Sequence, residues 1–400
     1  MSTLLIVFIT FWVLLFIKEK DLFAPWSLTL LVWIFVISGF LSLEHGLFDV
    51  TNQFIKGITL WVVSFCTTSY IVFRLTPSYH GPEWAINKPL VKFFALMALA
   101  LVPFTLYRAI QSAIQMGGNN LMYAMRIQML DSESGFSLGP LAYFIHVIYT
   151  ILFISVDTKK KINKYFFAFC MAINFTFFLI TMSKLILFIG ILSTLYLLYI
   201  HKHIKLRTIV LICLTFATIG IVFTQMRTSG DGSTEGTFTF MELIGMYIFS
   251  PIVAFCQEHG NTSPVFAYET LRPLYHILEV LGIYHGPVYD GYRPYVDVPI
   301  PTNVYTMLAP FFNDFGYPGI VACSIIEAAI IAWVYKKAYT GHTIFRNIYA
   351  FLIVIICLQF FDDQFYVGIS NILQMSILIT ICHVQFRWDT NDKWLWKKTN

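Results

Sequence analysis

The chain has 400 residues, 58% of them hydrophobic and only 12% charged, and its formal net charge is +4. Soluble domains carry about 25% charged residues, so this composition excludes a water-soluble globular fold. The small net charge gives no reason to expect a nucleic-acid partner. The apolar residues come in blocks of roughly 15 to 20, about the length with which a helix crosses a hydrocarbon core of roughly 30 Å. We therefore expect an all-α polytopic membrane protein.

The first apolar block, 4–17, lacks basic residues ahead of it and a small-residue cleavage site after it, which favours a retained span over a cleaved signal. About eleven crossings are expected in total. The others cover approximately 26–43, 57–73, 93–113, 138–156, 165–182, 185–200, 208–226, 315–335, 348–361 and 368–383. The cysteines are spread singly and predict neither a disulfide framework nor a metal site, and no cofactor is expected.

The basic residues predict the orientation of these spans. Most of the 26 lysines and arginines lie in alternate connections, at 18–20, 74–92, 159–164, 202–207 and 336–346 and in the carboxyl-terminal tail. Basic connections stay on the cytoplasmic side of a membrane. We therefore expect the amino terminus outside and the carboxyl terminus inside.

The chain then divides into amino-terminal spans in 1–226, a long outside connection in 227–314, and carboxyl-terminal spans with a cytoplasmic tail in 315–400. Connections of this length are uncommon unless they carry a function. An apolar stretch inside it, 238–255, is either a twelfth crossing or an amphipathic or re-entrant helix at the outer interface. We favour the second alternative, because a crossing would move an acid-rich segment into the cytoplasm.

The cations on the expected outer face oppose the charge bias and are candidates for anion binding. Guanidinium groups bind phosphate oxygens bidentately, which suits a diphosphate. The alternative is that these side chains extend to lipid headgroups. The candidate substrate-binding cations are Arg108, Arg126, Lys184, Arg227, Arg272 and Arg293.

A region rich in Tyr, Asn, Asp, Arg and His, 284–316, is typical of a sugar site, because rings stack on sugar faces and planar polar groups bond to hydroxyls. Its candidate sugar-binding residues are Tyr292, Asn303 and Asp314. The alternative is a proline-pinned loop with ordinary surface tyrosines.

A transfer to a sugar hydroxyl also needs a proton acceptor. The leading candidate catalytic bases are His276, His285 and Asp290, and His259, Asp297 and Asp314 compete with them. A hydrogen-bonded structural histidine is the alternative for each imidazole. Asp362 and Asp363 are expected to contribute charge at the last outside turn, and Glu327 is expected to be paired within the helix bundle.

Three motifs stand out: Pro-Thr-Asn-Val-Tyr at 301–305, Phe-Asn-Asp-Phe-Gly-Tyr-Pro-Gly at 312–319 and Met-Arg at 226–227. They resemble motifs of the bacterial O-antigen and oligosaccharide repeat-unit polymerases of the Wzy type. Met-Ser-Lys-Leu at 182–185 is similar to the family's basic start of a span, although arginine is commoner there. The resemblance extends over most of the chain, through the number of spans and the one large late loop.

The resemblance implies a glycosyltransferase at the periplasmic face of a bacterial inner membrane. Both the glycan donor and the repeat-unit acceptor would be linked to undecaprenyl diphosphate, and a chain-length regulator is a possible partner. The alternatives are an O-antigen ligase, which transfers glycan to lipid A, a lipid-linked oligosaccharide flippase, and a membrane acyltransferase that would depend on His146.

Overall fold

The computed structural model describes residues 1–115, 121–130, 138–215, 218, 241, 244–291, 293–299 and 301–384. Within these residues, six helices are long and apolar enough to cross a membrane. They are α1 (Ser2–Glu19), α2 (Pro25–Ser42), α3 (Asn52–Leu75), α4 (Lys88–Gln115), α7 (Lys164–Thr181) and α13 (Leu308–Tyr339). The predicted class, an all-α membrane protein, is confirmed, and the number of crossings stays a prediction.

The remaining elements are shorter. Helices α5 (Leu121–Leu130), α6 (Phe144–Val156), α8 (Lys184–Ile200), α14 (Thr343–Cys357) and α15 (Ile369–His383) follow the predicted blocks, except for α5, which was not expected. The long connection contains the π-helix η3 (Gly245–Phe249), α11 (Ser250–Phe255), α12 (Arg272–Val280) and two short antiparallel strands, β1 (Val296–Asp297) and β2 (Pro301–Thr302). A 3₁₀ turn, η2 (Gly139–Tyr143), leads into α6.

The chain forms two compact units. The first contains Met1–Tyr79, Thr239–Thr340 and Ile355–Leu373, and the second contains His80–Phe238, Gly341–Val354 and Gln374–Asn400. Residues 239–314 of the expected outer connection therefore belong to the first unit, together with the turn that carries Asp362 and Asp363.

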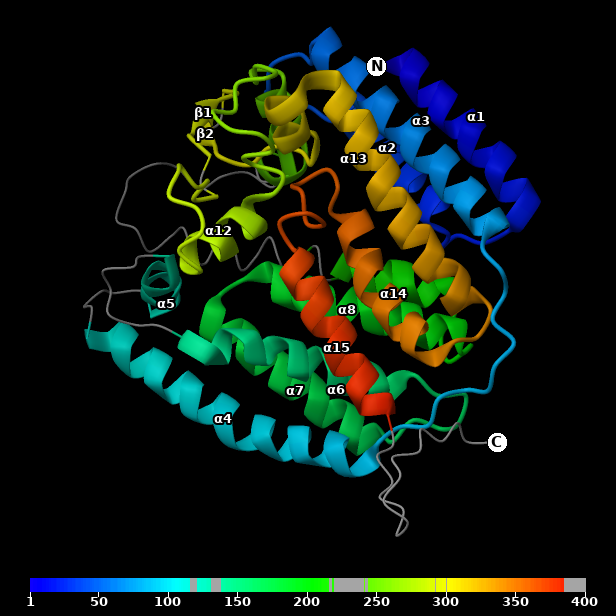
Figure 1. Ribbon diagram of the computed structural model, residues 1–400, viewed down its shortest axis with the longest axis vertical. Coiled ribbons are helices and arrows are strands. Elements are labelled where there is room, and N and C mark those ends of the chain that lie inside the picture. Colours follow the sequence, from blue (N-terminus) through cyan, green and yellow to red (C-terminus); the bar gives the residue numbers. More distant parts are fainter. Residues whose placement is uncertain are drawn as a thin grey trace. The chain divides into compact units, whose positions relative to one another are not determined.

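In the first unit, α1, α2, α3 and α13 lie side by side (Figure 1). Aromatic side chains fill the space between them: Trp61 of α3 stacks on Phe311 of α13 with ring centroids 5.5 Å apart. Gly57 of α3 lets α13 approach closely, since a Cβ there would lie 3.3 Å from Leu308. Burial of large rings fixes these helices against one another, and aliphatic side chains such as Ile326 remain exposed, as expected of a lipid-facing surface.

Helix α13 bends near its start. Gly316 has φ 64° and ψ −152°, which are not helical values, and Pro318 follows it inside the helix. Proline removes a backbone donor and its ring clashes with the carbonyl four residues earlier, while only glycine adopts this backbone conformation readily. The sequence placed the start of this span at Phe315, whereas the helix begins at Leu308 and its first turns form a separate piece before the bend.

Different connecting segments lie at the two ends of this bundle. At one end, Arg74 pairs with Glu19 at 2.5 Å, and the Tyr335 hydroxyl donates to Asp21. At the other end, where α3 begins, the Gln53 amide donates to the carbonyl oxygens of Phe255 and Glu258 at 2.9 and 2.8 Å. The sequence assigned these two sets of connections to opposite faces of a membrane, and they lie at opposite ends of the same helices.

The π-helix η3 and α11 run along the connection between α2 and α3. A Cβ on Gly245, at the start of η3, would lie 3.4 Å from the carbonyl oxygen of His45. Cys256, directly after α11, accepts the backbone N–H of Thr51 at 3.3 Å. Both contacts fall within this one connection, 43–51. At ~1.5 Å per residue, η3 and α11 together span ~17 Å, well short of a hydrocarbon core of roughly 30 Å.

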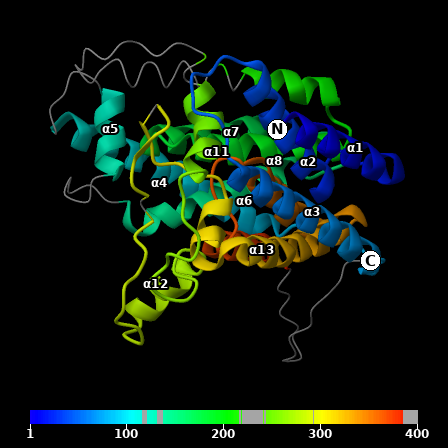
Figure 2. The same ribbon diagram turned by 90° about the horizontal axis from the view of Figure 1, so that it is seen from above.

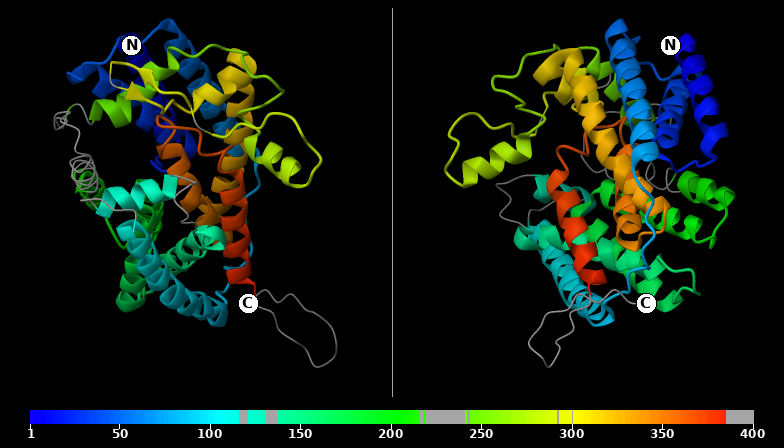
Figure 3. Two further views of the ribbon diagram at one scale, coloured as in Figure 1. Left: turned by 90° about the vertical axis from the view of Figure 1, so that its left-hand side faces the viewer. Right: turned by 45° about the vertical axis from the view of Figure 1, so that its right-hand side comes forward.

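In the second unit, α6 is buried on nearly all sides among its neighbours α4, α7 and α8 (Figures 1 and 3). Directly after α6, Asp157 accepts hydrogen bonds from Arg346 at 2.6 and 3.0 Å, from Asn347 at 2.6 Å and from His201 at 2.6 Å. Burial raises the pKa of Asp157, but the bonds from His201 and Arg346 outweigh it and hold the pKa below its ordinary value. The predicted cytoplasmic connections thus meet at one point of this unit.

Candidate functional site

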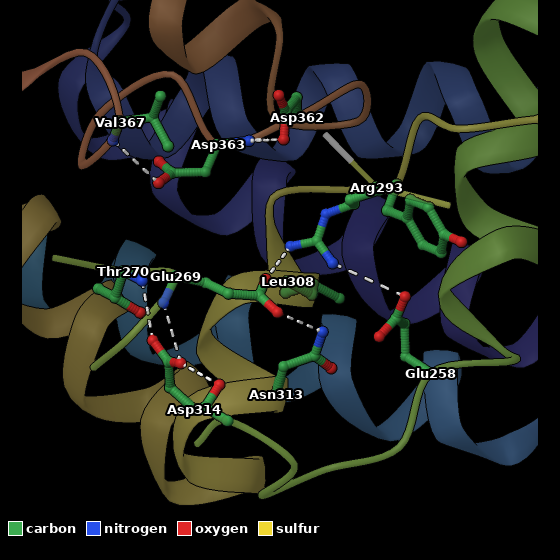
Figure 4. Close-up of polar contacts among 12 residues, drawn as sticks. Glu258, Glu269, Thr270, Arg293, Leu308, Asn313, Asp314, Asp362, Asp363 and Val367 are labelled. Carbon is green, nitrogen blue, oxygen red and sulfur yellow. Dashed lines mark hydrogen bonds and ion pairs between the residues drawn. The ribbon is translucent and has the colours of Figure 1, made fainter. Parts of the chain in front are cut away.

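A cluster of charged side chains in the first unit surrounds Arg293 (Figure 4). We call it the Arg293 cluster. Four segments supply it: the loop after α11, the loop before β1, the first turns of α13, and the turn between α14 and α15. Its members are Glu258, Glu269, Arg293, Asn313, Asp314, Asp362 and Asp363.

Arg293 holds the cluster together through two carboxylates. Its guanidinium forms a short ion pair with Glu269 and a second ion pair of 3.7 Å with Glu258. The Tyr305 ring lies 5.1 Å from the guanidinium carbon and the Tyr289 ring 5.9 Å from it. Burial lowers the pKa of Arg293, but Glu269 and the other anions raise it more, so this side chain stays charged.

Glu269 is the partner that connects this ion pair to α13. Its other oxygen accepts a hydrogen bond of 3.0 Å from the Asn313 amide. Burial raises the pKa of Glu269, and the opposing effect of Arg293 does not restore the ordinary value. Glu269 is therefore a buried carboxylate whose charged form is stabilised by Arg293 and Asn313.

Asp314 fixes the backbone beneath Glu269. Its carboxylate accepts the Ser263 hydroxyl at 2.5 Å and the backbone N–H groups of Glu269 and Thr270 at 3.1 and 2.8 Å. The carbonyl of Asn313 accepts two further N–H groups from the same loop, those of Thr262 and Ser263. The motif at 312–319, expected to bind sugar through Asp314, thus clamps the segment that carries Glu269.

The turn between α14 and α15 adds two carboxylates with different surroundings. Asp363 is buried and accepts the backbone N–H groups of Phe365, Tyr366 and Val367, so it caps its own turn. Asp362 is half-buried and accepts one N–H, that of Asp363, at 2.8 Å. Burial, together with the charge of Asp363, raises the pKa of Asp362 to about 7. Burial also raises the pKa of Asp363, to about 6, although the hydrogen bonds of its own turn and the charge of Arg293 lower it.

Arg272 lies beside this cluster in a different environment. Its guanidinium donates to the carbonyl oxygen of Asp290 at 2.8 Å and lies 6.0 Å from the Tyr289 ring. It forms no ion pair within the part of the chain that the structure describes. Its positive charge nevertheless acts on Asp362 and lowers the pKa of that carboxyl, against the effect of burial.

A glycine makes room for this guanidinium. Gly291 has φ +89°, and a Cβ on it would lie 1.9 Å from Nη1 of Arg272. Arg272 thus passes over a backbone position where no side chain fits.

The three predicted bases lie outside the Arg293 cluster. His276 is exposed on α12, 3.4 Å from Glu279, and His285 is exposed in the following loop. The side chain of Asp290 is exposed, and its backbone carbonyl receives Arg272. Asn303 is half-buried directly after β2. The proposed roles of these residues stay predictions.

Two further expected site residues, Arg227 and Tyr292, lie outside the described residues. The other expected cations belong to the second unit. Arg108 lies with Gln111 and Gln115 on the exposed side of α4. Arg126 is half-buried on α5, and Lys184 is the first residue of α8.

Glu258 and Glu269 are the members of the cluster for which sequence reasoning proposed no role. The available signal was an excess of acid over base in the long connection, where each arginine needs a counterion if it is buried. Glu269 precedes Arg293 by 24 residues, and no local pattern joins them. The pair is visible only in the folded chain.

Comparisons with known proteins identify no relative. No family model matches the chain. No curated protein and no solved structure matches it either.

Proposed function

We propose that this protein is a membrane glycosyltransferase that polymerises oligosaccharide repeat units carried on undecaprenyl diphosphate, for O-antigen or a related surface polysaccharide. The expected place of the reaction is the periplasmic face of a bacterial inner membrane. The observation that carries the proposal is the Arg293 cluster with Arg272 beside it. Together they combine an arginine that is 11% exposed, a second arginine without a carboxylate partner among the described residues, aromatic rings and a carboxyl with a pKa near neutrality.

The position of the cluster within the first unit supports the proposed sidedness. The cluster lies at the end of the bundle where α3 begins. There, the side-chain amide of Gln53 donates to the carbonyl oxygen of Glu258. We infer that η3 and α11 form a re-entrant or interfacial helix at this end, because both of their ends contact the α2–α3 connection. This arrangement keeps the long connection on one side of the membrane.

In the proposed reaction, an acceptor hydroxyl oxygen attacks the anomeric carbon of the donor glycan. The bond from that carbon to the lipid diphosphate breaks, and the diphosphate leaves with the bonding electrons. The hydroxyl proton passes to a carboxylate or an imidazole. Positive groups aimed at the leaving group stabilise its developing charge.

Arg272 suits the leaving group better than Arg293 does. Arg293 already contacts two carboxylates, so an added diphosphate would be repelled by Glu258 and Glu269 or would have to displace them. Arg272 donates to a neutral carbonyl oxygen and retains its charge for an anion. We assign Arg272 to the diphosphate and Arg293 to the positioning of Glu269.

Asp362 joins His276, His285 and Asp290 as a candidate base. An effective general base has a pKa close to the working pH, and that of Asp362 is raised to about 7. Asp362 also has fewer backbone bonds to lose than Asp363, which caps its turn. A carboxylate in this position can accept the proton. Arg293 and Arg272 both lower its pKa, against the effect of burial.

The lipopolysaccharide ladder of a strain lacking the protein tests the function. We expect lipid A-core capped with a single repeat unit, because ligation continues without polymerisation. Uncapped core would indicate a ligase instead, and an unchanged ladder would rule out both activities. Complementation with Arg272→Ala should leave the single-unit band, whereas Arg272→Lys should restore polymer only partly, because a point charge does not reproduce a bidentate fork.

A further inference from the structure

Helix α12 (Arg272–Val280) has one polar and one apolar side. At 100° per residue, Arg272, Tyr275, His276 and Glu279 fall on one side. The aliphatic side chains of Leu274, Ile277, Leu278 and Leu281, the residue after the helix, fall on the other. No residue of α12 is buried.

The polar side contacts the protein through Arg272 and Tyr275, whereas the His276 and Glu279 side chains on the same side are 70% and 51% exposed. Arg272 donates to the carbonyl of Asp290, and the Tyr275 hydroxyl donates to that of Phe266 at 2.6 Å. The apolar side is open: Leu274, Ile277, Val280, Leu281 and Ile283 are between 48% and 75% exposed. A surface helix in water normally packs its apolar side against the protein. An apolar medium or partner is therefore expected to cover the apolar side of α12.

We propose that α12 lies in the headgroup region of the phospholipid bilayer, with Leu274, Ile277 and Leu281 directed into the acyl chains. Amphipathic helices bind membranes in this way, with the apolar side inserted by roughly 5 to 10 Å. Figure 2 shows α12 standing away from α13 within the first unit.

Two observations favour lipid over a second protein. The outward surface of α13 is itself apolar, with Ile326 and Ile330 exposed. A bilayer around α13 is therefore an apolar medium available to another helix of the same unit. A stable protein interface buries roughly 800 Å² on each partner, and five partly exposed aliphatic side chains of one short segment fall short of that area.

The charge of the segment makes the proposal specific. Arg272 and Glu279 balance one another within α12, so hydrophobic insertion and not attraction to anionic lipid is expected to hold it. Insertion would also set Arg272 at the depth of the lipid phosphates. The inference does not depend on glycosyl transfer, since it concerns the open side of α12 alone.

Site-specific photo-crosslinking in the full-length protein tests the proposal. A benzophenone amino acid is placed at Ile277 or Leu281, and the protein is reconstituted in nanodiscs of zwitterionic phospholipid with a radiolabelled phosphatidylcholine. The matched control carries the same group at Glu279, which is about 160° from Ile277 around the helix. Variants that elute as the wild-type protein are irradiated.

We expect at least fivefold more phospholipid adduct from Ile277 and Leu281 than from Glu279, with no loss in high salt. Equal labelling at all three positions would overturn the proposal. So would an adduct between Ile277 and a second copy of the chain, or between Ile277 and another segment of the same chain. If the group at Ile277 prevents reconstitution, Leu281 on the same side provides the same test.

Discussion

Asn313 donates a side-chain hydrogen bond of 3.0 Å to Glu269, which precedes it by 44 residues. The next residue, Asp314, accepts the backbone N–H of the same glutamate at 3.1 Å. Two adjacent residues at the start of α13 therefore fix both the side chain and the backbone of Glu269, and through Glu269 they fix Arg293. The bend at Gly316 and Pro318 separates this short piece from the long apolar part of α13.

Arg293→Ala should destabilise the protein strongly, because it leaves the buried carboxylate of Glu269 and the half-buried carboxylate of Glu258 without a cation. Loss of one partner of a buried ion pair typically costs about 3 to 5 kcal/mol. The added change Glu269→Gln should recover part of that loss, since it removes the uncompensated charge. Thermal unfolding in one detergent measures both variants. Equal stability of Arg293→Ala and the wild type would contradict the burial of this pair.

If Asp362 is the base, the rate of transfer should depend on pH through its ionisation. Below a pKa of about 7, the rate should fall nearly tenfold per pH unit, because only the deprotonated carboxylate accepts the proton. Asp362→Asn should lower the rate by roughly 10²- to 10⁴-fold and abolish this inflection. Single-turnover rates with lipid-linked repeat units across pH 5 to 9 provide the measurement.

Asp363→Asn is the matched control for that profile. The charge of Asp363 raises the pKa of Asp362, so its removal should shift the inflection to lower pH and leave the rate at high pH near normal. The asparagine side-chain oxygen can still accept N–H groups of the turn. If neither substitution changes the pH dependence of the rate, the base is His276, His285 or another group.

Gly291→Ala should impair the protein as Arg272→Ala does. A Cβ at this position would lie 1.9 Å from Nη1 of Arg272 and must displace that guanidinium. Gly282→Ala is the control, because Gly282 also has a positive φ, +68°, but no atom lies within 4 Å of its added Cβ. Both changes strain the backbone, so a much larger loss of polymer in Gly291→Ala would isolate the displacement of Arg272. Equal losses would indicate backbone strain alone.

In the second unit, Arg346→Ala should cost about 3 to 5 kcal/mol of stability, because Asp157 is buried and loses its arginine, keeping only Asn347 and His201 as partners. Lys159→Ala, which breaks the exposed Lys159–Glu83 pair, should cost less than about 1 kcal/mol. Thermal unfolding compares the two. Since the folded pKa of Asp157 is lowered, its stabilisation is present above its unfolded pKa of about 3.9 and should be lost only as the pH falls further.

Reporter fusions test the orientation. Fusions near Thr158 and His203 and at the carboxyl terminus should report the cytoplasm, and a fusion at Gly291 should report the periplasm, because basic connections remain inside. A cytoplasmic signal at Gly291 would mean that the stretch 238–255 crosses the membrane. The re-entrant arrangement of η3 and α11 would then be wrong.

The sequence by itself determined that this protein lies in a lipid bilayer and that it is built of helices. Long apolar blocks interrupted by short polar breaks leave a backbone few alternatives to helices in a bilayer. The helices α2, α7 and α8 accordingly begin and end within a few residues of the predicted limits. The same reasoning missed α5, a short helix of mixed composition, because its pattern is too brief to distinguish it from a loop.

Only the tertiary structure decided which charged residues act together. The sequence identified Arg272 and Arg293 as cations that oppose the charge bias, but it gave them the same role. The fold separates them: one donates to a backbone carbonyl and the other is paired with Glu258 and Glu269. The pKa of a carboxyl such as Asp362 likewise depends on burial and on charges brought in from distant segments. Such effects arise from distances in space, and spacing along the chain does not encode them.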